Sequence, residues 1–490
     1  MSDTALLTRP ADPPPGAGDP TEPVRRRNGL TWADPRLRLA VRRVITLMLL
    51  LPLLSVLARQ LPALTRDPGI LIYGFVVLAA TITMFYVAYT RYEDPSQYEL
   101  HRRPRDFATF PRLAADPKVS LLMAVKDEVD GIEQCIRSMV AADYPNLEVI
   151  VVDDMSTDGT REVLDALAAE LDITVLKLDK NVGKKHALVR GAELATGEVI
   201  AFTDSDCVLA EDAIRRCVLA LVHNSHLGAV SGHARALNPD ESPLTRIQDV
   251  WYEGQFRVAK AAEAAFGAVT CVSGPLAVFR REAIYNYLPA WANDRFLGGE
   301  FRFATDRQLT GYVLGQAWIG DKLKQAHRES PFIAGQDYTP RRWHVGYVES
   351  AKVLTTVPAR FRPFMRQQVR WKKSFIRNLF FNGRFMWRRG VGPSALYYGH
   401  ALWVAAAPIM AVRHLVLAPL SGAWMLTVFY LCGVLFKGTA WGLAYKIDHP
   451  GTTRWRYRPL MSLMSALVLA WLLPYSALTI RKSVWSRSTS

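Results

Sequence analysis

The chain has 490 residues, half of them hydrophobic, and carries a formal net charge of +15 at pH 7. This length accommodates a catalytic domain together with membrane segments. A basic chain can bind nucleic acid, but no nucleic-acid-binding motif occurs, so we expect no nucleic-acid partner. The five cysteines lack metal-binding spacing and indicate core thiols in a reducing compartment.

Residues 1–36 are rich in Pro, Gly, Asp and Arg, a composition that predicts a disordered tail. Two apolar runs follow, at 44–57 and 70–89, and each extends to spanning length, so residues 37–92 are predicted to form a transmembrane hairpin. Arginines precede the first run and Arg91 follows the second, which places both ends in the cytoplasm of a multi-pass plasma-membrane protein. Membrane lipids are therefore expected partners of the basic flanks.

Residues 93–338 are predicted to form a cytoplasmic domain in which strand and helix patterns alternate. Such alternation indicates an α/β fold with a mostly parallel sheet covered by helices. The predicted strands are 119–125, 149–152, 174–178 and 199–202, and the predicted helices are 131–142, 161–170 and 184–195.

Two acidic clusters follow two of these strands. Asp153 and Asp154 come directly after the strand at 149–152, and Asp204 and Asp206 follow the strand at 199–202. Ligands of open α/β sheets bind beyond the carboxyl ends of the strands, so the clusters suit a nucleotide and the cation that neutralises its phosphates. A plain turn or an EF-hand loop explains one cluster alone, but an EF-hand loop follows a helix, and here a strand precedes it.

Asp204 and Asp206 are the candidate ligands for Mg²⁺ or Mn²⁺, which would act as a Lewis acid on a departing diphosphate. Lys184 begins a helix after a glycine, where backbone donors and a cation favour an anion; a solvated surface lysine is the alternative.

The order of motifs resembles the family 2 glycosyltransferases with the GT-A fold. The resemblance rests on Asp-Tyr-Pro-Asn at 143–146, the Asp153–Asp154 loop, Asn-Val-Gly-Lys-Lys at 181–185 and Asp-Ser-Asp at 204–206. Three later motifs, Ser-Gly-Pro at 273–275, Ala-Thr-Asp-Arg at 304–307 and Gln-Gln-Val-Arg-Trp at 367–371, are similar to the processive membrane branch. Within that branch the sequence is most similar to hyaluronan synthases and chitin-oligosaccharide synthases.

The resemblance implies a role for each motif. Asp306 is implied as the base that deprotonates the acceptor, although this chain has Ala-Thr-Asp-Arg where the family pattern is Gly-Asp-Asp-Arg. The nucleotide-sugar is implied to be bound by Asp154, with Asp153 as the second choice, and by Lys184, Asp204, Gln367, Arg370 and Trp371. The acceptor sugar is implied to be bound by Ser273, Gly274, Pro275, Arg307 and Trp371.

Residues 339–392 are predicted to form interfacial amphipathic helices that carry the Gln-x-x-Arg-Trp motif and snorkelling arginines. Residues 393–485 contain three apolar windows, at 393–412, 415–445 and 459–480. Because basic residues flank both ends of the last window, we expect two clean spans followed by a re-entrant, interfacial or hairpinned segment.

The C-terminal tail, 486–490, follows Trp485, and Arg487 lies within it. Hyaluronan synthases carry Trp-Gly-Thr-Arg near their end, a segment thought to close over bound nucleotide. Here Trp485 and Arg487 are interpreted either as such a gate, stacking on uracil and meeting phosphate, or as an interfacial anchor of the last segment.

Together these features predict a processive, inverting β-glycosyltransferase that elongates a polysaccharide from UDP-sugars and extrudes it across the membrane. UDP-GlcNAc is the expected donor, and UDP-glucuronate is left open as a second. One alternative is a lipid-carrier glycosyltransferase that adds a single sugar, which has no need of the Gln-x-x-Arg-Trp motif. Another is a non-catalytic membrane scaffold or transporter with a degenerate transferase domain, in which losses among the acids would be scattered.

Overall fold

The computed structural model describes residues 44, 51, 68–104, 109–303 and 305–482. The chain divides into two units, Met1–Ile45 and Thr46–Ser490, and the second contains every element discussed below. The predicted tails at 1–36 and 486–490, and nearly all of the first apolar run, lie outside the described residues.

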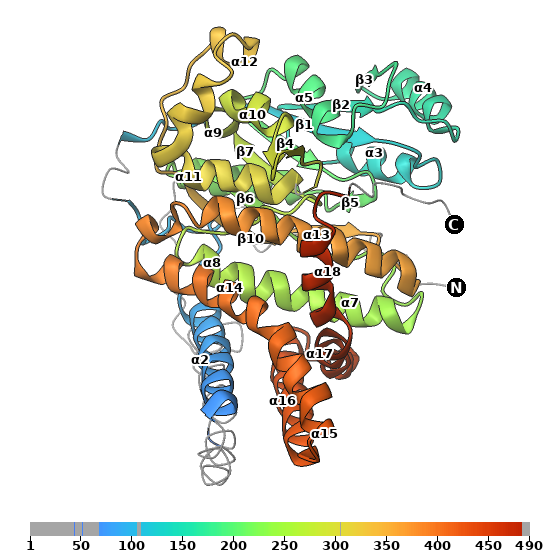
Figure 1. Ribbon diagram of the computed structural model, residues 1–490. Coiled ribbons are helices and arrows are strands. Elements are labelled where there is room, and N and C mark those ends of the chain that lie inside the picture. The colour runs from blue at the N-terminus through green and yellow to red at the C-terminus, as the bar shows by residue number, and fades with distance from the viewer. Residues whose placement is uncertain (1–43, 45–50, 52–67, 105–108, 304, 483–490) are drawn as a thin grey trace, which may run out of the picture. The chain divides into compact units, whose positions relative to one another are not determined.

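One eight-stranded mixed sheet forms the core of the second unit, with strand order β3-β2-β1-β4-β7-β6-β10-β5 (Figure 1). Its strands are β1 (Val119–Val125), β2 (Leu147–Asp153), β3 (Thr174–Lys177), β4 (Val199–Thr203), β5 (Cys207–Leu209), β6 (Leu227–Ala236), β7 (Ala277–Arg280) and β10 (His344–Thr355). A separate two-stranded ribbon pairs β8 (Arg295–Phe296) with β9 (Gly299–Glu300). Every residue of β1 and β4 is buried, as expected for strands covered on both faces.

The predicted alternation of strands and helices is confirmed through β4. The helices of this half are α3 (Ile132–Val140), α4 (Thr160–Glu170) and α5 (Lys184–Leu194). Parallel ladders join β3 to β2, β2 to β1 and β1 to β4, so the carboxyl ends of these strands meet at one edge of the sheet.

The second half of the sheet departs from the mostly parallel prediction. β7 is antiparallel to both β4 and β6, and β5 is antiparallel to β10, so the sheet is mixed. The short strand β7 follows directly after the loop that carries Ser273–Pro275. A mixed sheet with this helical cover is a GT-A-like fold.

The prediction of helices throughout 339–392 was wrong for its first part. His344–Thr355 forms β10, which pairs in parallel with β6 inside the sheet. Val345, Val348 and Val353 are buried in this strand, and β-branched residues of this kind favour a pleated, buried surface. The sheet domain therefore extends past residue 338, and only the following segment is helical.

Helices cover the sheet and continue into the apolar C-terminal part. The domain helices after β5 are α6 (Ala213–His223), α7 (Pro243–Glu253), η3 (Gly254–Lys260), α8 (Ala261–Ala264), α9 (Arg281–Ile284), η4 (Tyr285–Tyr287), α10 (Leu288–Ala292), α11 (Thr305–Gln325) and α12 (Pro331–Ala334). The later helices are α13 (Phe361–Asn382), η5 (Met386–Arg389), α14 (Val391–Val412), η6 (Arg413–Leu417), α15 (Ala418–Leu420), α16 (Trp424–Asp448), η7 (Arg454–Tyr457), α17 (Arg458–Leu467), η8 (Leu469–Trp471) and α18 (Leu472–Leu478).

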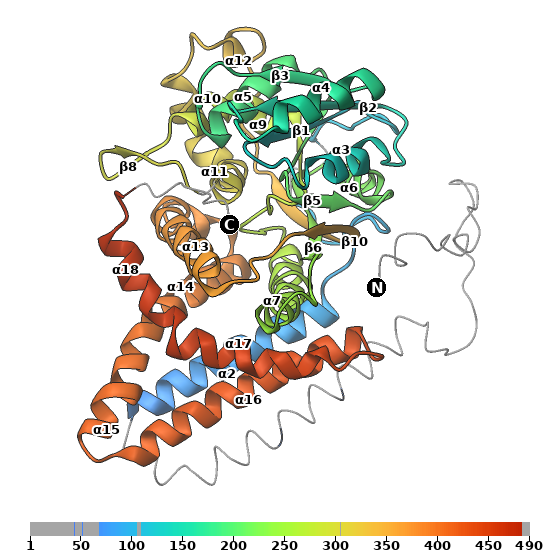
Figure 2. The same cartoon turned by 90° about the vertical axis from the view of Figure 1, so that its right-hand side faces the viewer.

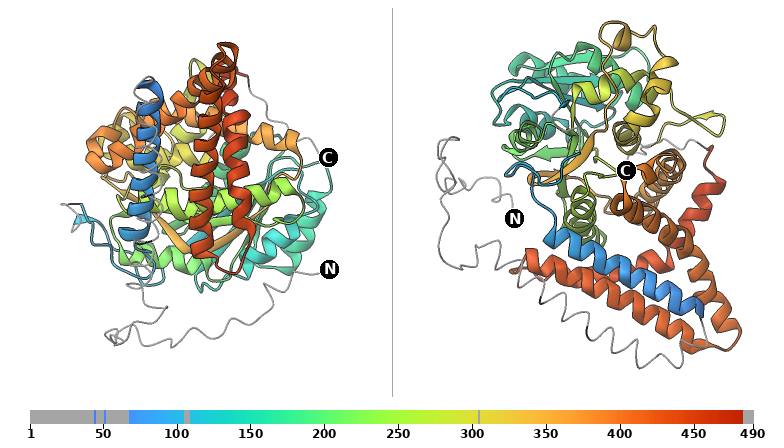
Figure 3. Two further views of the ribbon diagram at one scale, coloured as in Figure 1. Left: turned by 90° about the horizontal axis from the view of Figure 1, so that it is seen from below. Right: turned by 90° about the vertical axis from the view of Figure 1, so that its left-hand side faces the viewer.

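Three described helices are long and apolar enough to cross a membrane, namely Ile72–Thr90 in α2 (Pro68–Thr90), Val391–Leu420 and Trp424–Asp448. A fourth candidate, Arg454–Leu467 with Leu469–Leu478, is bent by 41° at its break. This bend lies in the window where the sequence predicts a broken or re-entrant segment. In Figures 2 and 3, α2, α16 and α17 lie on one side of the sheet domain, beyond α7 and α13, and α14 runs from the level of α13 down beside them.

Candidate active site

The acids of the second cluster lie where β4 ends. β4 runs through Thr203, and Asp204 and Asp206 follow it, within a turn that leads into the buried strand β5. Ligand atoms of Asp204, Asp206 and Cys207 all lie within 4.8 Å of one another. Burial and the neighbouring Asp204 raise the pKa of Asp206 to about 6, because two close carboxylates oppose each other's ionisation.

The donor set fits a hard divalent cation. Burial, with the two acids beside it, raises the pKa of the Cys207 thiol well above its usual range, so Cys207 stays protonated and offers no thiolate for a soft metal. The remaining donors are carboxylate oxygens, which Mg²⁺ and Mn²⁺ prefer. Gly274 leaves room beside them, since a Cβ at that position would lie 2.7 Å from Oδ2 and 3.0 Å from Oδ1 of Asp204.

A cation from the protein already faces this cluster. Lys184, the first residue of α5, forms an ion pair with Asp204. Burial opposes the charge of this lysine, but Asp204 and Asp206 raise its pKa. Gly183 precedes it with φ of +86°, a backbone conformation that glycine adopts without strain. The helix start therefore sets an ammonium group beside the two acids, where a diphosphate would meet it.

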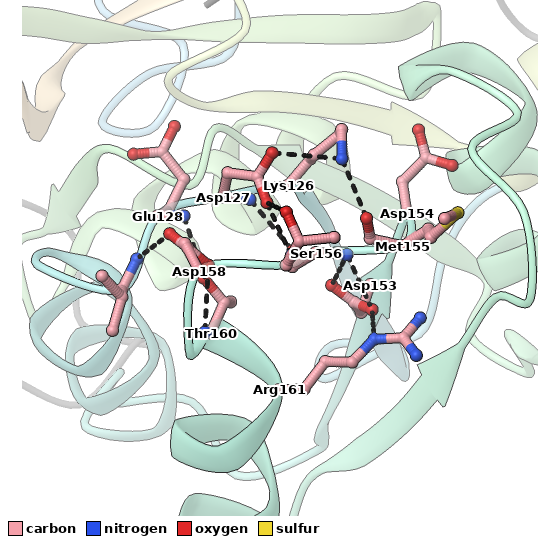
Figure 4. A network of polar contacts seen from close by, with 12 residues as sticks. Lys126, Asp127, Glu128, Asp153, Asp154, Met155, Ser156, Asp158, Thr160 and Arg161 are labelled. Carbon is pink, nitrogen blue, oxygen red and sulfur yellow. Dashed lines mark hydrogen bonds and ion pairs between the residues drawn. The ribbon is translucent and has the colours of Figure 1, made fainter. Parts of the chain in front are cut away.

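The first acidic cluster holds two loops together (Figure 4). Asp153 is fully buried, accepts a hydrogen bond from Arg161 Nε at 2.6 Å and is also bonded to the backbone N–H of Ser156. Asp154 accepts hydrogen bonds from the N–H groups of Val182 and Gly183, at 2.7 and 2.8 Å. Asp154 thus fixes the end of β2 against the glycine turn that precedes Lys184.

The loop after β2 also carries backbone strain. Met155 has φ of +62°, and its carbonyl accepts a hydrogen bond from Lys126 Nζ at 2.8 Å. Asp127, in the facing loop, has φ of +50° and accepts from the N–H of Thr157 at 2.8 Å. Strained non-glycine residues persist where surrounding contacts over-determine them, and they cluster at functional sites.

Asp306 is the second residue of α11, and one loop connects it to the region of the acids. Cys271 Sγ lies 3.4 Å from an oxygen of the Asp306 carboxylate, as a weak donor. Three residues further along that loop, Gly274 lies against Asp204. Three residues of chain span roughly 10 Å at most, so the implied base and the implied metal ligands belong to one site. Thr305, at the position of the missing family acid, is the first residue of α11 and offers a hydroxyl in place of a carboxylate.

The loop at 271–275 is itself fixed from both sides. Ser273 N–H donates to Ser231 Oγ at 3.2 Å, and the carbonyl of Pro275 accepts from Thr203 Oγ1 at 2.9 Å. The implied acceptor residues Ser273, Gly274 and Pro275 therefore lie between β4 and β6. Arg307 lies next to Asp306. Burial lowers the pKa of Arg307, but the nearby Cys271, Asp306 and Glu263 raise it by more.

The Gln-x-x-Arg-Trp motif lies on α13 and faces the acids. Burial lowers the pKa of Arg370, whereas Asp204 and Asp206 act in the opposite sense, which places its guanidinium within their field. The ring of Trp371 lies 5.6 Å from that of Trp251 and 6.2 Å from that of Tyr252, both on α7. Gln367 Oε1 is buried and accepts no hydrogen bond from the described residues.

Not all of α13 behaves as the predicted interfacial helix. Arg377 is buried and donates to Asp294 from Nε at 3.0 Å, and Lys373 Nζ donates to the carbonyl of Lys482 at 2.7 Å. These two cations are satisfied inside the protein instead of snorkelling to headgroups, because α13 packs between α11 and α18.

Three residues near the site escaped the sequence interpretation. Trp251 and Tyr252 complete the aromatic group around Trp371, and Cys271 contacts the implied base. Trp251 and Tyr252 could have been found from the sequence, because two adjacent aromatic residues at the end of an amphipathic helix are typical of a sugar-binding surface. No local pattern marks Cys271, because only the fold brings it to Asp306. Trp485 and Arg487 lie outside the described residues.

Comparison with known proteins agrees with this geometry. Residues 120–288 match the family model "Glycosyl transferase family 2". The chain is 32% identical over 266 residues to an N-acetylglucosaminyltransferase of Mesorhizobium japonicum, covering 54% of this chain and 57% of that protein. It is 31% identical over 274 residues to an N-acetylglucosaminyltransferase of Bradyrhizobium diazoefficiens, covering 55% and 51%. The chain thus spans about half the length of these two relatives.

A longer match joins the chain to a hyaluronan synthase of Streptococcus pyogenes, 26% identical over 378 residues, 76% of this chain and 83% of that protein. Among solved structures, a mannosyltransferase from Pyrobaculum calidifontis in complex with GDP-Man and Mn²⁺ covers 83% of this chain and 98% of its own, with 20% identity and a TM-score of 0.48. The chain therefore carries a family 2 glycosyltransferase domain. Within that family it is similar to N-acetylglucosaminyltransferases and hyaluronan synthases.

Proposed function

We propose that this protein is a processive, inverting β-glycosyltransferase that elongates a polysaccharide from UDP-sugars and passes it through its own membrane helices. UDP-GlcNAc is the proposed donor, in keeping with the names of the similar proteins, and UDP-glucuronate is the proposed second donor if the product alternates. The sheet domain is proposed to face the cytoplasm of a multi-pass plasma-membrane protein.

The observation that carries the proposal is the position of Trp371. Its ring packs with Trp251 and Tyr252, while the neighbouring Arg370 lies in the field of Asp204 and Asp206. Aromatic faces stack on sugar rings, so the end of a growing chain would rest here beside the donor. An enzyme that adds one sugar and releases its product has no need of such a support.

The proposed chemistry assigns one task to each group. Asp204 and Asp206 would hold a divalent cation, which when bound would supply Lewis-acid stabilisation of the leaving diphosphate. Lys184 and Arg370 bind the same diphosphate by charge. Asp306 takes the proton from the acceptor hydroxyl as that oxygen attacks the anomeric carbon, and the glycosidic bond forms as the bond to UDP breaks. The buried Oε1 of Gln367, which has no partner among the described residues, would accept a hydrogen bond from a hydroxyl of the donor or the acceptor.

Contacts between the helices support a polymer path. The ring of Phe375 on α13 lies 5.8 Å from that of His400 on α14, and His400 lies 6.0 Å from Trp403. Lys437 Nζ on α16 lies 3.3 Å from the centre of the Trp403 ring. A lysine and aromatic rings inside apolar candidate spans are typical of substrate paths, because isolated polar groups in lipid are costly.

The deciding experiment incubates membranes containing the full chain with radiolabelled UDP-GlcNAc, with and without UDP-glucuronate, and sizes the product. Polymer formed from UDP-GlcNAc alone indicates a chitin-type product, and polymer that needs both donors indicates an alternating one. Single-sugar products on a lipid would contradict processivity. Addition of EDTA should abolish transfer and Mn²⁺ or Mg²⁺ should restore it; full activity in EDTA would overturn the metal assignment.

A further inference from the structure

A basic cavity of about 470 Å³ lies apart from the residues of the candidate active site. Four arginines, Arg102, Arg103, Arg342 and Arg389, line it together with His344 and Phe266. No acidic side chain is among the lining residues that the structure describes. Four guanidinium groups around one small cavity repel each other, and an anionic ligand would relieve that repulsion.

Arg389 forms the buried floor of this basic cavity. It is 6% exposed, and it donates hydrogen bonds to the carbonyls of Leu314, Gly267 and Trp343 at 2.9 to 3.1 Å. Its Nε has no partner among the described residues. Burial and the nearby Arg342 lower the pKa of Arg389 to about 9. A buried cation held only by neutral carbonyls lacks the paired charge that proteins normally supply.

Apart from Pro104, the other groups that line the basic cavity are basic or aromatic. Arg102 lies 4.8 Å over the ring of Phe266, and Arg342 lies 5.5 Å over the ring of Trp318. Arg103 differs from the other three arginines, because it forms an ion pair with Glu99. Burial lowers the pKa of His344 well below its usual range, and four basic neighbours add to this effect: Arg389, His226, Arg102 and Arg342.

The basic cavity adjoins a candidate membrane span. Arg389 ends η5, and the span that begins at Val391 follows it after one residue. Phe266 packs against the first turn of that span, since a Cβ at Gly392 would lie 2.4 Å from Phe266 Cε1. Arg102 comes shortly after α2, whose candidate span ends at Thr90. Basic pockets in this position are where the headgroups of anionic lipids bind.

We propose that the basic cavity binds a phosphate ester, and that the ester is the headgroup of an anionic phospholipid. Arg102, Arg342 and Arg389 would contact the phosphate oxygens, for which the planar guanidinium fork is well shaped. Phe266 would contact the glycerol part. The volume suits a headgroup better than a bare phosphate ion. The inference requires that α14 lies in a bilayer, and it does not depend on which sugars are transferred.

The test uses the full-length protein in mixed detergent micelles with phosphatidylglycerol or phosphatidylcholine, and native mass spectrometry counts the lipids retained. Arg102→Gln and Arg342→Gln, singly and together, remove cavity charges without touching the carbonyl contacts of Arg389. Arg388→Gln is the matched control, because Arg388 is adjacent in sequence, stacks on Trp387 at 4.8 Å and does not line the cavity.

We expect wild-type protein and Arg388→Gln to retain phosphatidylglycerol in preference to phosphatidylcholine. The double variant should retain roughly tenfold less phosphatidylglycerol, from the loss of two cationic contacts. An equal loss in Arg388→Gln would show diffuse surface attraction and overturn the proposal. Displacement of the lipid by millimolar glycerol 3-phosphate, but not by inorganic sulfate, would assign the cavity to a soluble phosphate ester and overturn the lipid source. Unchanged thermal unfolding of the variants confirms that they fold.

Discussion

Individual side chains in the candidate active site have little freedom to move. Asp204 contacts Lys184 on one side and the backbone of Gly274 on the other, and Asp306 contacts Cys271 at the far end of the same loop. A displacement at any one of these positions is passed to the others, because the loop between them is short. A change of one methyl group or one carboxylate oxygen is therefore expected to alter the activity.

Gly274→Ala should weaken metal binding without removing any ligand. The new methyl group would lie within 3 Å of both oxygens of Asp204, so the carboxylate must move. We expect activity to fall roughly 10- to 100-fold and the Mn²⁺ concentration for half-maximal activity to rise. Metal titration of transfer measures both. Gly299→Ala, in β9 with open space around the Cβ, is the control. An unchanged metal requirement would remove Gly274 from the metal site.

Asp306→Asn should separate catalysis from binding. The amide keeps the shape of the side chain but accepts no proton, so turnover should fall by about 10² or more while UDP affinity is largely kept. Isothermal titration with UDP and initial rates measure the two effects. Asp321→Asn, exposed on the same helix, is the control and should behave as wild type. Lost UDP affinity with high residual turnover would make Asp306 a binding residue.

At the scale of elements, one carboxylate joins the starts of β1, β2 and β4, at the end of the sheet opposite the candidate active site. Glu148, near the start of β2, accepts hydrogen bonds from the N–H and Oγ1 of Thr196 at 2.7 and 2.8 Å and also bonds Ser120 on β1. Lys118 lies 2.8 Å from it. Burial opposes its charge, yet these donors lower the pKa of Glu148 to about 2. Glu148 thus ties β1, β2 and the chain entering β4 together.

Glu148→Gln should cost stability in a pH-dependent way. A carboxylate with a depressed pKa in the folded state contributes stability that is present above about pH 4.5 and is lost as the pH falls toward 2. We expect a loss of about 1–3 kcal/mol near neutral pH, and a difference from wild type that shrinks below pH 4.5. Thermal unfolding measured between pH 2.5 and 7 tests this. Glu162→Gln, exposed on α4, should show no such dependence.

At the scale of the whole described unit, buried charges connect the sheet domain to the apolar helices. Arg257 on η3 contacts Glu349 on β10 at 3.1 Å and Asp448, the last residue of α16, at 3.4 Å. Tyr89, near the end of α2, donates to Asp448 at 3.0 Å. Buried pairs of this kind add little net stability, but they impose one arrangement, because any other leaves a charge unpaired. These contacts therefore link η3 and β10 of the sheet domain to the ends of the candidate spans in α2 and α16.

Lys437→Met should shorten the polymer without abolishing transfer. Lys437 lies over Trp403 within the candidate spans, far along the chain from the acids of the site. If the product passes this point, removing the cation should lower the affinity of an anionic chain and reduce product length several-fold. Initial rates of sugar incorporation should change less than twofold, and gel analysis measures product length. Lys437→Arg, which keeps the charge, should restore the length; equal lengths in all three proteins would contradict the path.

Local elements and the order of the motifs could be predicted from the amino-acid sequence. The strands and helices from Val119 to Thr203 follow from runs of β-branched residues and amphipathic spacing, which are local properties. The acids at the ends of β2 and β4, and the apolar windows, could be found for the same reason. The mixed order of the sheet and the entry of β10 into it could not, because strand pairing depends on contacts between residues far apart in the chain.

The pairing of charged groups became visible only in the folded protein. Asp153 pairs with Arg161 and Asp154 with two backbone amides, a division of roles that the adjacent acids do not reveal in sequence. Cys271 meets Asp306, and Trp251 meets Trp371, in each case from a distant part of the chain. The arginines of the basic cavity likewise come from separate segments. Such sites need side chains placed to within about an ångström, and that placement is set by packing across the whole fold and not by local propensity.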